Sequence, residues 1–201
     1  MDFCLLKSNL EKMGYAVSCF DTAIQASEYL ESAIENETVG IGGSVTIREM
    51  GLYDKLSLKN KVYWHWKLQD DMTVSEARAL ARSASIYLSS VNGIAETGEI
   101  VNIDGDGNRV SEIMYGHKKV YFIIGKNKIT KDCEGALYRA RNIAAPLNAK
   151  RLNKRTPCAF KTDKCYNCKS PDRICRGLSI LWSKPESCAY EVILINEELG
   201  Y

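Results

Sequence analysis

The sequence predicts an α/β protein, a three-layer α/β/α sandwich with a mainly parallel sheet, small antiparallel hairpins and a Cys-rich C-terminal segment. Strand-length apolar segments alternate with helix-length ones over residues 2–89, which indicates parallel βαβ units. Glycine turn signals crowd residues 91–110, and four cysteines lie between Cys158 and Cys175. A chain of 201 residues suits one domain, 1–201, with a Cys-rich metal-binding segment, 155–188, inside it.

In the N-terminal half, the spacing of apolar residues and the helix-capping residues predict the helices and strands. Phe3, Leu6 and Leu10 recur at helical spacing. Asp21 is the expected N-cap of the second helix, and Thr73 with Glu76 fits a capping box. The expected elements are helix 2–13, strand 15–20, helix 21–34, strand 38–41, helix 45–56 interrupted near Gly51, strand 61–66, helix 73–83 and strand 84–89.

The second half starts with turns. Asn92-Gly93, Thr97-Gly98 and the run DGDGN at 104–108 predict antiparallel hairpins. The DGDGN run resembles part of a calcium loop but lacks the glutamate at loop position twelve, so a hairpin turn is favoured. The remaining expected elements are strand 119–125, helix 133–143 stopped near Pro146, and strand 190–195.

Composition excludes several classes of protein. No apolar run reaches membrane-spanning length and the start has no signal-peptide pattern, so we expect a cytoplasmic protein with reduced thiols and no membrane partner. Residues 139–176 carry eleven Lys or Arg against two Asp, a net charge of +9, although the whole chain is at +2. That segment suits an anionic metabolite or an acidic partner. Nucleic acid is not expected, because no stacking-aromatic motif accompanies the arginines.

Cys158, Cys165, Cys168 and Cys175 form the pattern C-x6-C-x2-C-x6-C. Four thiolates suit tetrahedral zinc or an iron–sulfur cluster, and basic surroundings favour the thiolate form. The spacing matches neither the usual pair of short zinc motifs nor the bacterial ferredoxin run. Free thiols are the alternative, but the polar, Lys-rich surroundings are unlike a core strand. The pattern therefore does not distinguish zinc from an iron–sulfur cluster.

A glycine loop follows the predicted strand 38–41. Gly42, Gly43, Ser44 and Thr46 could direct main-chain N–H groups and hydroxyls at an anion, where a helix N-terminus adds positive potential. The loop has neither the third glycine of a dinucleotide fingerprint nor the lysine of a P-loop. A tight turn with Ser44 as the helix N-cap is an equally weighted interpretation.

Other titratable side chains give weaker signals. Glu96, between two turns, could act as nucleophile or general base, although an exposed strand residue is the simpler interpretation. His65 is expected to be a packed ring, and His117 is expected on an exposed turn.

The segments VGIGGSVTIREMG, VNGIAETGEIV, ARNIAAPLNAKRL and PCAFKTDKCYNCKSPDRICR, followed by VILINEELGY, resemble the lactate-utilisation (LUD-domain, YkgG-like) family over nearly the whole chain. The resemblance implies a fold similar to sugar-phosphate isomerases and CoA-transferases. It implies ligand binding by the glycine loop and by Asn92, Arg141, Asn148 and Arg151, with Glu96 near a catalytic position.

The resemblance implies a role in lactate-like organic-acid metabolism, in a redox step with iron–sulfur partner proteins. Unlike the larger members, this chain has no ferredoxin-like pair of clusters. Two alternatives remain: an anion-binding or regulatory module with structural zinc, and a CoA-transferase-like or isomerase-like enzyme that uses Glu96. A homo-oligomer is compatible with each of these.

Overall fold

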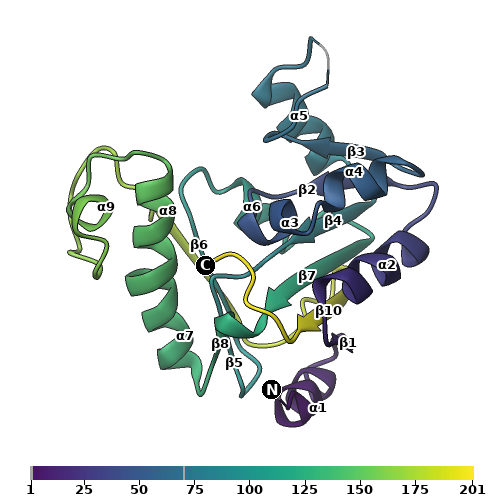
Figure 1. Cartoon of the computed structure of the whole chain (residues 1–201), viewed down its shortest axis with the longest axis horizontal. Coiled ribbons are helices and arrows are strands. Elements are labelled where there is room, and N and C mark those ends of the chain that lie inside the picture. Colours follow the sequence, from purple (N-terminus) through teal and green to yellow (C-terminus); the bar gives the residue numbers. More distant parts are fainter. Residues whose placement is uncertain (1, 70) are drawn as a thin grey trace.

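A computed structural model describes residues 2–69 and 71–201 and contains a large parallel sheet beside a small one (Figure 1). Across the large sheet the strands run β1 (Ala16–Phe20), β10 (Ala189–Ile195), β7 (Lys119–Gly125), β4 (Ile86–Ser89), β2 (Thr38–Ile41) and β3 (Lys61–Trp64). Each neighbouring pair in this order is parallel. The predicted strands 38–41 and 119–125 are confirmed to the residue.

The small sheet orders its strands β8 (Ile129–Thr130), β5 (Gly93–Ala95), β6 (Ile100–Asp104) and β9 (Gly177–Leu181). β6 is antiparallel to both β5 and β9. The turn through residues 96–99 is therefore the predicted antiparallel hairpin, whereas β9 joins from far along the chain.

Helices cover both faces of the large sheet. In chain order, the α-helices of the described residues are α1 (Cys4–Lys12), α2 (Ala23–Ala33), α3 (Val45–Glu49), α4 (Leu52–Ser57), α5 (Val74–Arg82), α6 (Asn108–Glu112), α7 (Cys133–Arg139), α8 (Ala145–Arg151) and α9 (Pro157–Lys161). Of these, α7 packs against the small sheet. Along β7, Tyr121 and Ile123 pack with α2, α3 and α4, whereas Val120 and Phe122 pack with α1 and the small sheet. This alternation confirms the layered α/β class, since successive strand residues face opposite sides of a sheet.

A glycine allows the close contact between β2 and α5. Val39 and Ile41 face the layer of α2 to α4, so position 40 faces the opposite layer. A Cβ on Gly40 would lie 2.4 Å from the carbonyl oxygen of Ala81 in α5. Only glycine fits there, which fixes how closely α5 approaches the sheet.

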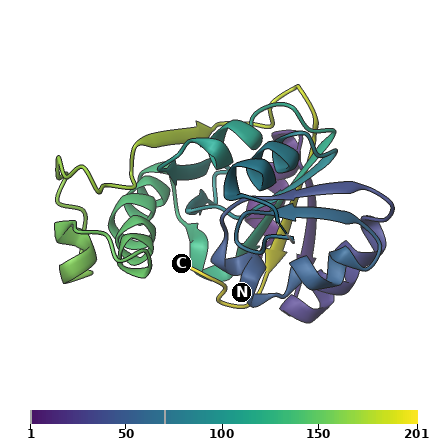
Figure 2. The same ribbon diagram turned by 90° about the horizontal axis from the view of Figure 1, so that it is seen from above.

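The predicted helix end near Pro146 is wrong. α7 continues through a π-helical stretch, Ala140–Ala144, into α8, and Pro146 lies in the first turn of α8. The π-helical turn changes the hydrogen-bond pattern just where proline has no N–H to donate. The resulting continuous helix, residues 133–151, lies beside the sheets, with α9 on its outer side (Figure 2).

Three local expectations are also corrected. Thr22, not Asp21, caps α2, because the Thr22 hydroxyl and the Gln25 side chain form a capping box. The DGDGN turn leads into helix α6 and not into a hairpin, because Asp104 accepts the main-chain N–H of Gly107 and of Arg109, both at 3.1 Å. His117 is buried, with its ring stacked 4.8 Å from that of Tyr87.

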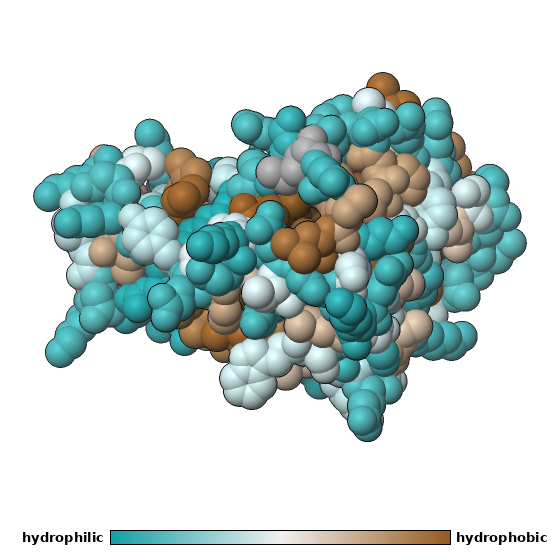
Figure 3. All heavy atoms as spheres, turned by 90° about the horizontal axis from the view of Figure 1, so that it is seen from below, coloured by the Kyte–Doolittle hydropathy of each residue, from teal (hydrophilic) through white to brown (hydrophobic). Residues whose placement is uncertain are grey.

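Among the described residues, no helix is both long and apolar enough to cross a membrane. The face seen from below is mainly hydrophilic, with hydrophobic residues gathered in a few patches (Figure 3).

Candidate functional site

A cavity of about 490 Å³ lies at the carboxyl ends of β2 and β4. Gly43 and Ser44 line it after β2, and Ser90 and Asn92 line it after β4. Helix α8 forms the opposite side. The third side comes from the cysteine loop, which we define as residues 155–176. Carboxyl ends of neighbouring parallel strands are a common position for ligand sites in α/β proteins.

The glycine loop reaches the cavity only in part. Gly43 and Ser44 line the cavity, whereas Gly42 and Thr46 are not among its lining residues. The Ser44 hydroxyl accepts the N–H of Ile47 at 3.2 Å, so the predicted N-cap is confirmed. Anion binding by this loop stays a prediction.

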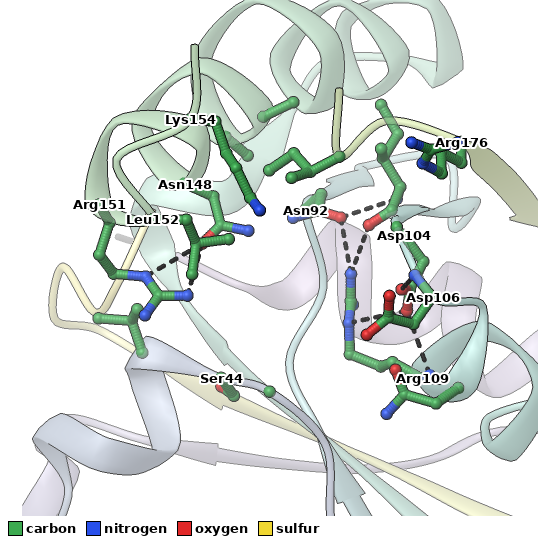
Figure 4. A pocket seen from close by; sticks show the side chains of 18 of the residues that line it. Ser44, Asn92, Asp104, Asp106, Arg109, Asn148, Arg151, Leu152, Lys154 and Arg176 are labelled. Atoms are coloured by element: carbon green, nitrogen blue, oxygen red, sulfur yellow. Dashed lines mark hydrogen bonds and ion pairs between the residues drawn. The ribbon is translucent and has the colours of Figure 1, made fainter. Parts of the chain in front are cut away.

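Arg109 fixes the wall formed by β4 and β6. Its guanidinium donates to the carbonyl oxygen of Ser90 at 3.1 Å, to the side-chain oxygen of Asn92 at 3.0 Å and to that of Asn102. Asp104 lies 3.8 Å away as an ion-pair partner. Burial lowers the pKa of Arg109, with the Asp104 charge opposing that effect. These contacts hold Asn92 at the cavity surface (Figure 4).

Lys128 lines the cavity with a side chain that is almost fully buried. Its amine lies 2.8 Å from the hydroxyl oxygen of Thr46 and 2.8 Å from that of Ser90. Burial lowers the pKa of Lys128 to about 7, and the charges of Arg139 and Arg109 act in the same direction. A lysine with such a pKa exchanges its proton near neutral pH, which is the property required of a general base.

Helix α8 contributes the third group of polar side chains. Arg151 donates from Nε to the side-chain oxygen of Asn148 at 3.0 Å and to the hydroxyl of Tyr201 at 2.7 Å. Its guanidinium lies 4.5 Å from the centre of the Trp66 ring. Figure 4 shows Asn148, Arg151 and Lys154 across the cavity from Asn92 and Arg109. The sequence-predicted residues Ser44, Asn92, Asn148 and Arg151 are therefore brought to one cavity.

Two further predicted site residues, Glu96 and Arg141, lie outside the cavity lining. Glu96 follows β5 and is not among the residues that line the cavity; its main-chain oxygen accepts from the Asn9 side chain at 2.8 Å. Arg141 does not line the cavity either, and its guanidinium lies 3.8 Å from the Cys165 sulfur and 3.4 Å from the side-chain oxygen of Asn167. The catalytic role of Glu96 stays a prediction.

The four cysteines are partly buried free thiols in the cysteine loop. Arg173 donates to the Cys175 sulfur at 3.3 Å. This hydrogen bond raises the pKa of Arg173, and the charges of Cys175, Cys168 and Cys165 act in the same direction. Within residues 2–69 and 71–201, no three His, Cys, Asp or Glu side chains are grouped closely enough to hold a metal ion.

Sequence reasoning missed several residues of the site. Ser90, Arg109, Lys128, Tyr201 and His65 line the cavity. For Lys128 a usable signal existed: it closely follows a continuous apolar strand, 119–125, and residues at the carboxyl end of a parallel strand often face the ligand. No comparable signal marks Arg109, because its contacts with Ser90 and Asn92, 19 and 17 residues away in the chain, form only in the folded protein.

Comparisons with known proteins agree with this architecture. A crystal structure of a DUF162 family protein from Deinococcus radiodurans superposes with a TM-score of 0.54 over 97% of this chain and 99% of that chain, at 12% identity, and so shares the fold. No curated protein matches the sequence. The family model described as the LUD domain matches residues 5–195. This chain therefore belongs to the LUD-domain family.

Proposed function

We propose that this LUD-domain protein binds a small organic-acid anion in the cavity, beside an iron–sulfur cluster or zinc held by Cys158, Cys165, Cys168 and Cys175. With a cluster bound, it would serve a redox step of lactate-like organic-acid metabolism together with iron–sulfur partner proteins. One observation carries the proposal: residues between Cys168 and Cys175, namely Pro171–Ile174, line the same cavity as Lys128 and Arg151.

The charge of the cavity supports an anionic ligand. Arg109 and Arg78 are paired with Asp104 and Asp106 respectively. Besides the buried Lys128, four further cationic side chains of the lining have no carboxylate within ion-pair distance in the described part of the chain, namely Arg151, Lys154, Arg173 and Arg176. A carboxylate ligand can supply the missing negative charge, and arginine binds carboxylates through paired hydrogen bonds.

The chemistry of the cysteine loop fits a metal. Four sulfur donors lie on one short loop, and guanidinium groups contact two of them, Arg141 at Cys165 and Arg173 at Cys175. Neighbouring positive charge favours the thiolate that a metal requires. The thiols must draw closer together to share one ion, and a bound metal supplies the free energy for such a movement. A bound cluster would supply one-electron transfer.

The metal is tested by purifying the protein without oxygen and measuring iron, acid-labile sulfide and zinc, with a visible spectrum. We expect iron and sulfide in equal amounts with broad visible absorption, and their loss in Cys165→Ser. A control, Cys4→Ser, changes an exposed thiol outside the loop and should keep the metal. Stoichiometric zinc without colour would favour the anion-binding module with structural zinc. A metal-free protein would contradict both.

Anion binding is tested by titrating the protein calorimetrically with lactate and with pyruvate. We expect Arg151→Met to weaken binding at least about tenfold, because a hydrogen bond to a charged group contributes about 1.5–3 kcal/mol. Arg82→Met, which changes an exposed arginine outside the cavity, should leave the affinity unchanged. Equal affinity in both variants would place the anion elsewhere.

A further inference from the structure

We propose that Ser90 and Lys128 form a nucleophile–base pair that accepts the acyl group of a small anionic ester on the Ser90 hydroxyl. This activity goes beyond anion binding and metal-dependent redox chemistry, because it uses neither the cysteines nor a metal. It rests on the arrangement of three hydroxyl and amine groups at the carboxyl end of β4.

Ser90 is positioned as a nucleophile should be. It directly follows β4, lines the cavity and is 5% exposed. The Ser89 hydroxyl, at 2.9 Å, and the Arg109 guanidinium, at 3.1 Å, both donate to its carbonyl oxygen and hold its main chain. Its own hydroxyl lies 2.8 Å from the Lys128 amine. A nucleophile within hydrogen-bond reach of a base is the recurrent arrangement of covalent catalysis.

The direction of each hydrogen bond defines the role of Lys128. The Thr46 hydroxyl donates its single proton to the carbonyl oxygen of Leu199 at 3.1 Å. Thr46 must therefore accept from the Lys128 amine, at 2.8 Å. A neutral amine then keeps one lone pair, which can accept the Ser90 hydroxyl proton. Thr46 is the third group that orients the base.

The surroundings of Lys128 favour the neutral amine. Burial is the main cause of its lowered pKa, and the positive charges of Arg139 and Arg109 add to it. The carboxylate of Glu49 acts in the opposite direction. Lysines placed next to other cationic groups in desolvated sites are activated in this way.

The reaction conserves atoms and charge. Lys128 takes the Ser90 proton while the hydroxyl oxygen bonds to the carbonyl carbon, and the bond from that carbon to the leaving oxygen breaks. The Lys128 ammonium then gives the proton to the leaving alkoxide. Water hydrolyses the acyl–Ser90 ester by the same route. Arg151 and Lys154, across the cavity, favour a substrate that carries a carboxylate.

The test uses mono-4-nitrophenyl terephthalate, an activated ester whose free carboxylate is held on a rigid ring and cannot attack its own ester. We expect a burst of one nitrophenolate per chain and, by peptide mass spectrometry, the 4-carboxybenzoyl group on Ser90. Ser90→Ala should abolish the burst, and Lys128→Met should slow it by about 100-fold or more, because general bases contribute about 10²–10⁴-fold. Ser111→Ala, which changes an exposed serine of α6, should react like the native protein.

The pH profile gives a second readout that does not depend on a variant folding. The native acylation rate should rise through about pH 7 as Lys128 loses its proton. A flat profile, acylation at other residues, or an unchanged burst in Ser90→Ala would overturn the proposal. Calorimetric binding of lactate to Ser90→Ala would remain in each case, so failure here is distinct from failure of anion binding.

Discussion

Two of the three walls of the cavity, the sheet side and the cysteine loop, are held in different ways. On the sheet side, Arg109 and Lys128 are buried and their side-chain nitrogens contact protein oxygens. In the cysteine loop, Arg173 and Arg176 bind main-chain carbonyls of the loop itself, and Phe160 is 78% exposed. One wall is fixed by the core, whereas the other is held mainly by polar contacts within the loop.

This difference in how the walls are held suits them to different roles in binding. Buried polar groups are held rigidly where they are paired, as Arg109 and Lys128 are, so the sheet wall can orient a ligand without help from the cysteine loop. The cysteine loop has few buried apolar contacts, and segments of that kind open at low free-energy cost. A loop of this sort can adjust to a metal ion, and the metal in turn would fix it against the cavity.

The largest difference in stability between the two walls should come from replacing one phenylalanine in each region. Phe122 in β7 is fully buried, and Phe122→Ala should reduce the free energy of unfolding by about 3–5 kcal/mol, the usual cost of emptying a core site. Phe160→Ala, in the cysteine loop, should change it by less than about 0.5 kcal/mol. Urea unfolding measures both. Similar losses would show that the loop has a core of its own.

The second largest difference in stability between the two walls should come from replacing one arginine in each. Arg109→Met removes a buried guanidinium that donates to the side-chain oxygens of Asn92 and Asn102 and offsets the charge of Asp104, so we expect a loss of about 3 kcal/mol. Arg155→Met removes an ion pair with Asp172 in which the arginine side chain is 85% exposed, so we expect less than about 0.5 kcal/mol. Thermal unfolding of both variants checks the contrast.

The buried lysine predicts a pH dependence of stability. Its pKa is about 7 in the folded protein, against about 10.4 in an unfolded chain. Between these values the unfolded chain binds a proton that the folded protein has lost, so stability rises with pH. Below about pH 7 both states are protonated and the full cost of the buried charge is present.

This dependence is measured as the stability difference between the native protein and Lys128→Met from pH 7 to pH 9. The native protein should gain up to about 1.4 kcal/mol per pH unit relative to the variant. The variant Lys126→Met changes a lysine that lies outside the cavity lining and should show no such pH-dependent difference from the native protein. A constant difference for Lys128→Met would mean that its amine stays charged throughout.

The smallest effect is expected at the cysteines when no metal is bound. Cys165 is partly buried, and Cys165→Ser should change the unfolding free energy of the chelated protein by less than about 0.5 kcal/mol. Adding metal should raise the Tm of the native protein and leave that of the variant unchanged. Equal responses would show that the metal binds without this thiol.

Local sequence patterns predicted much of the fold and part of the site. The apolar run 119–125 predicted a strand with the bounds that the structure shows. The Ser44 cap and the Thr73–Glu76 capping box also form as expected. These features depend on interactions between residues a few positions apart, so the sequence alone is enough to predict them. The helix end at Pro146 was misjudged because a π-helical turn accommodates the proline.

The sequence by itself determined the α/β class, the LUD family and the residue types offered to the site. Only the tertiary structure decided that β10 lies between β1 and β7, and that Lys128 meets Ser90 and Thr46, 38 and 82 residues away in the chain. Such pairings depend on which strands become neighbours in the sheet. Because that choice is made by the burial of all the strands together, no local spacing records it.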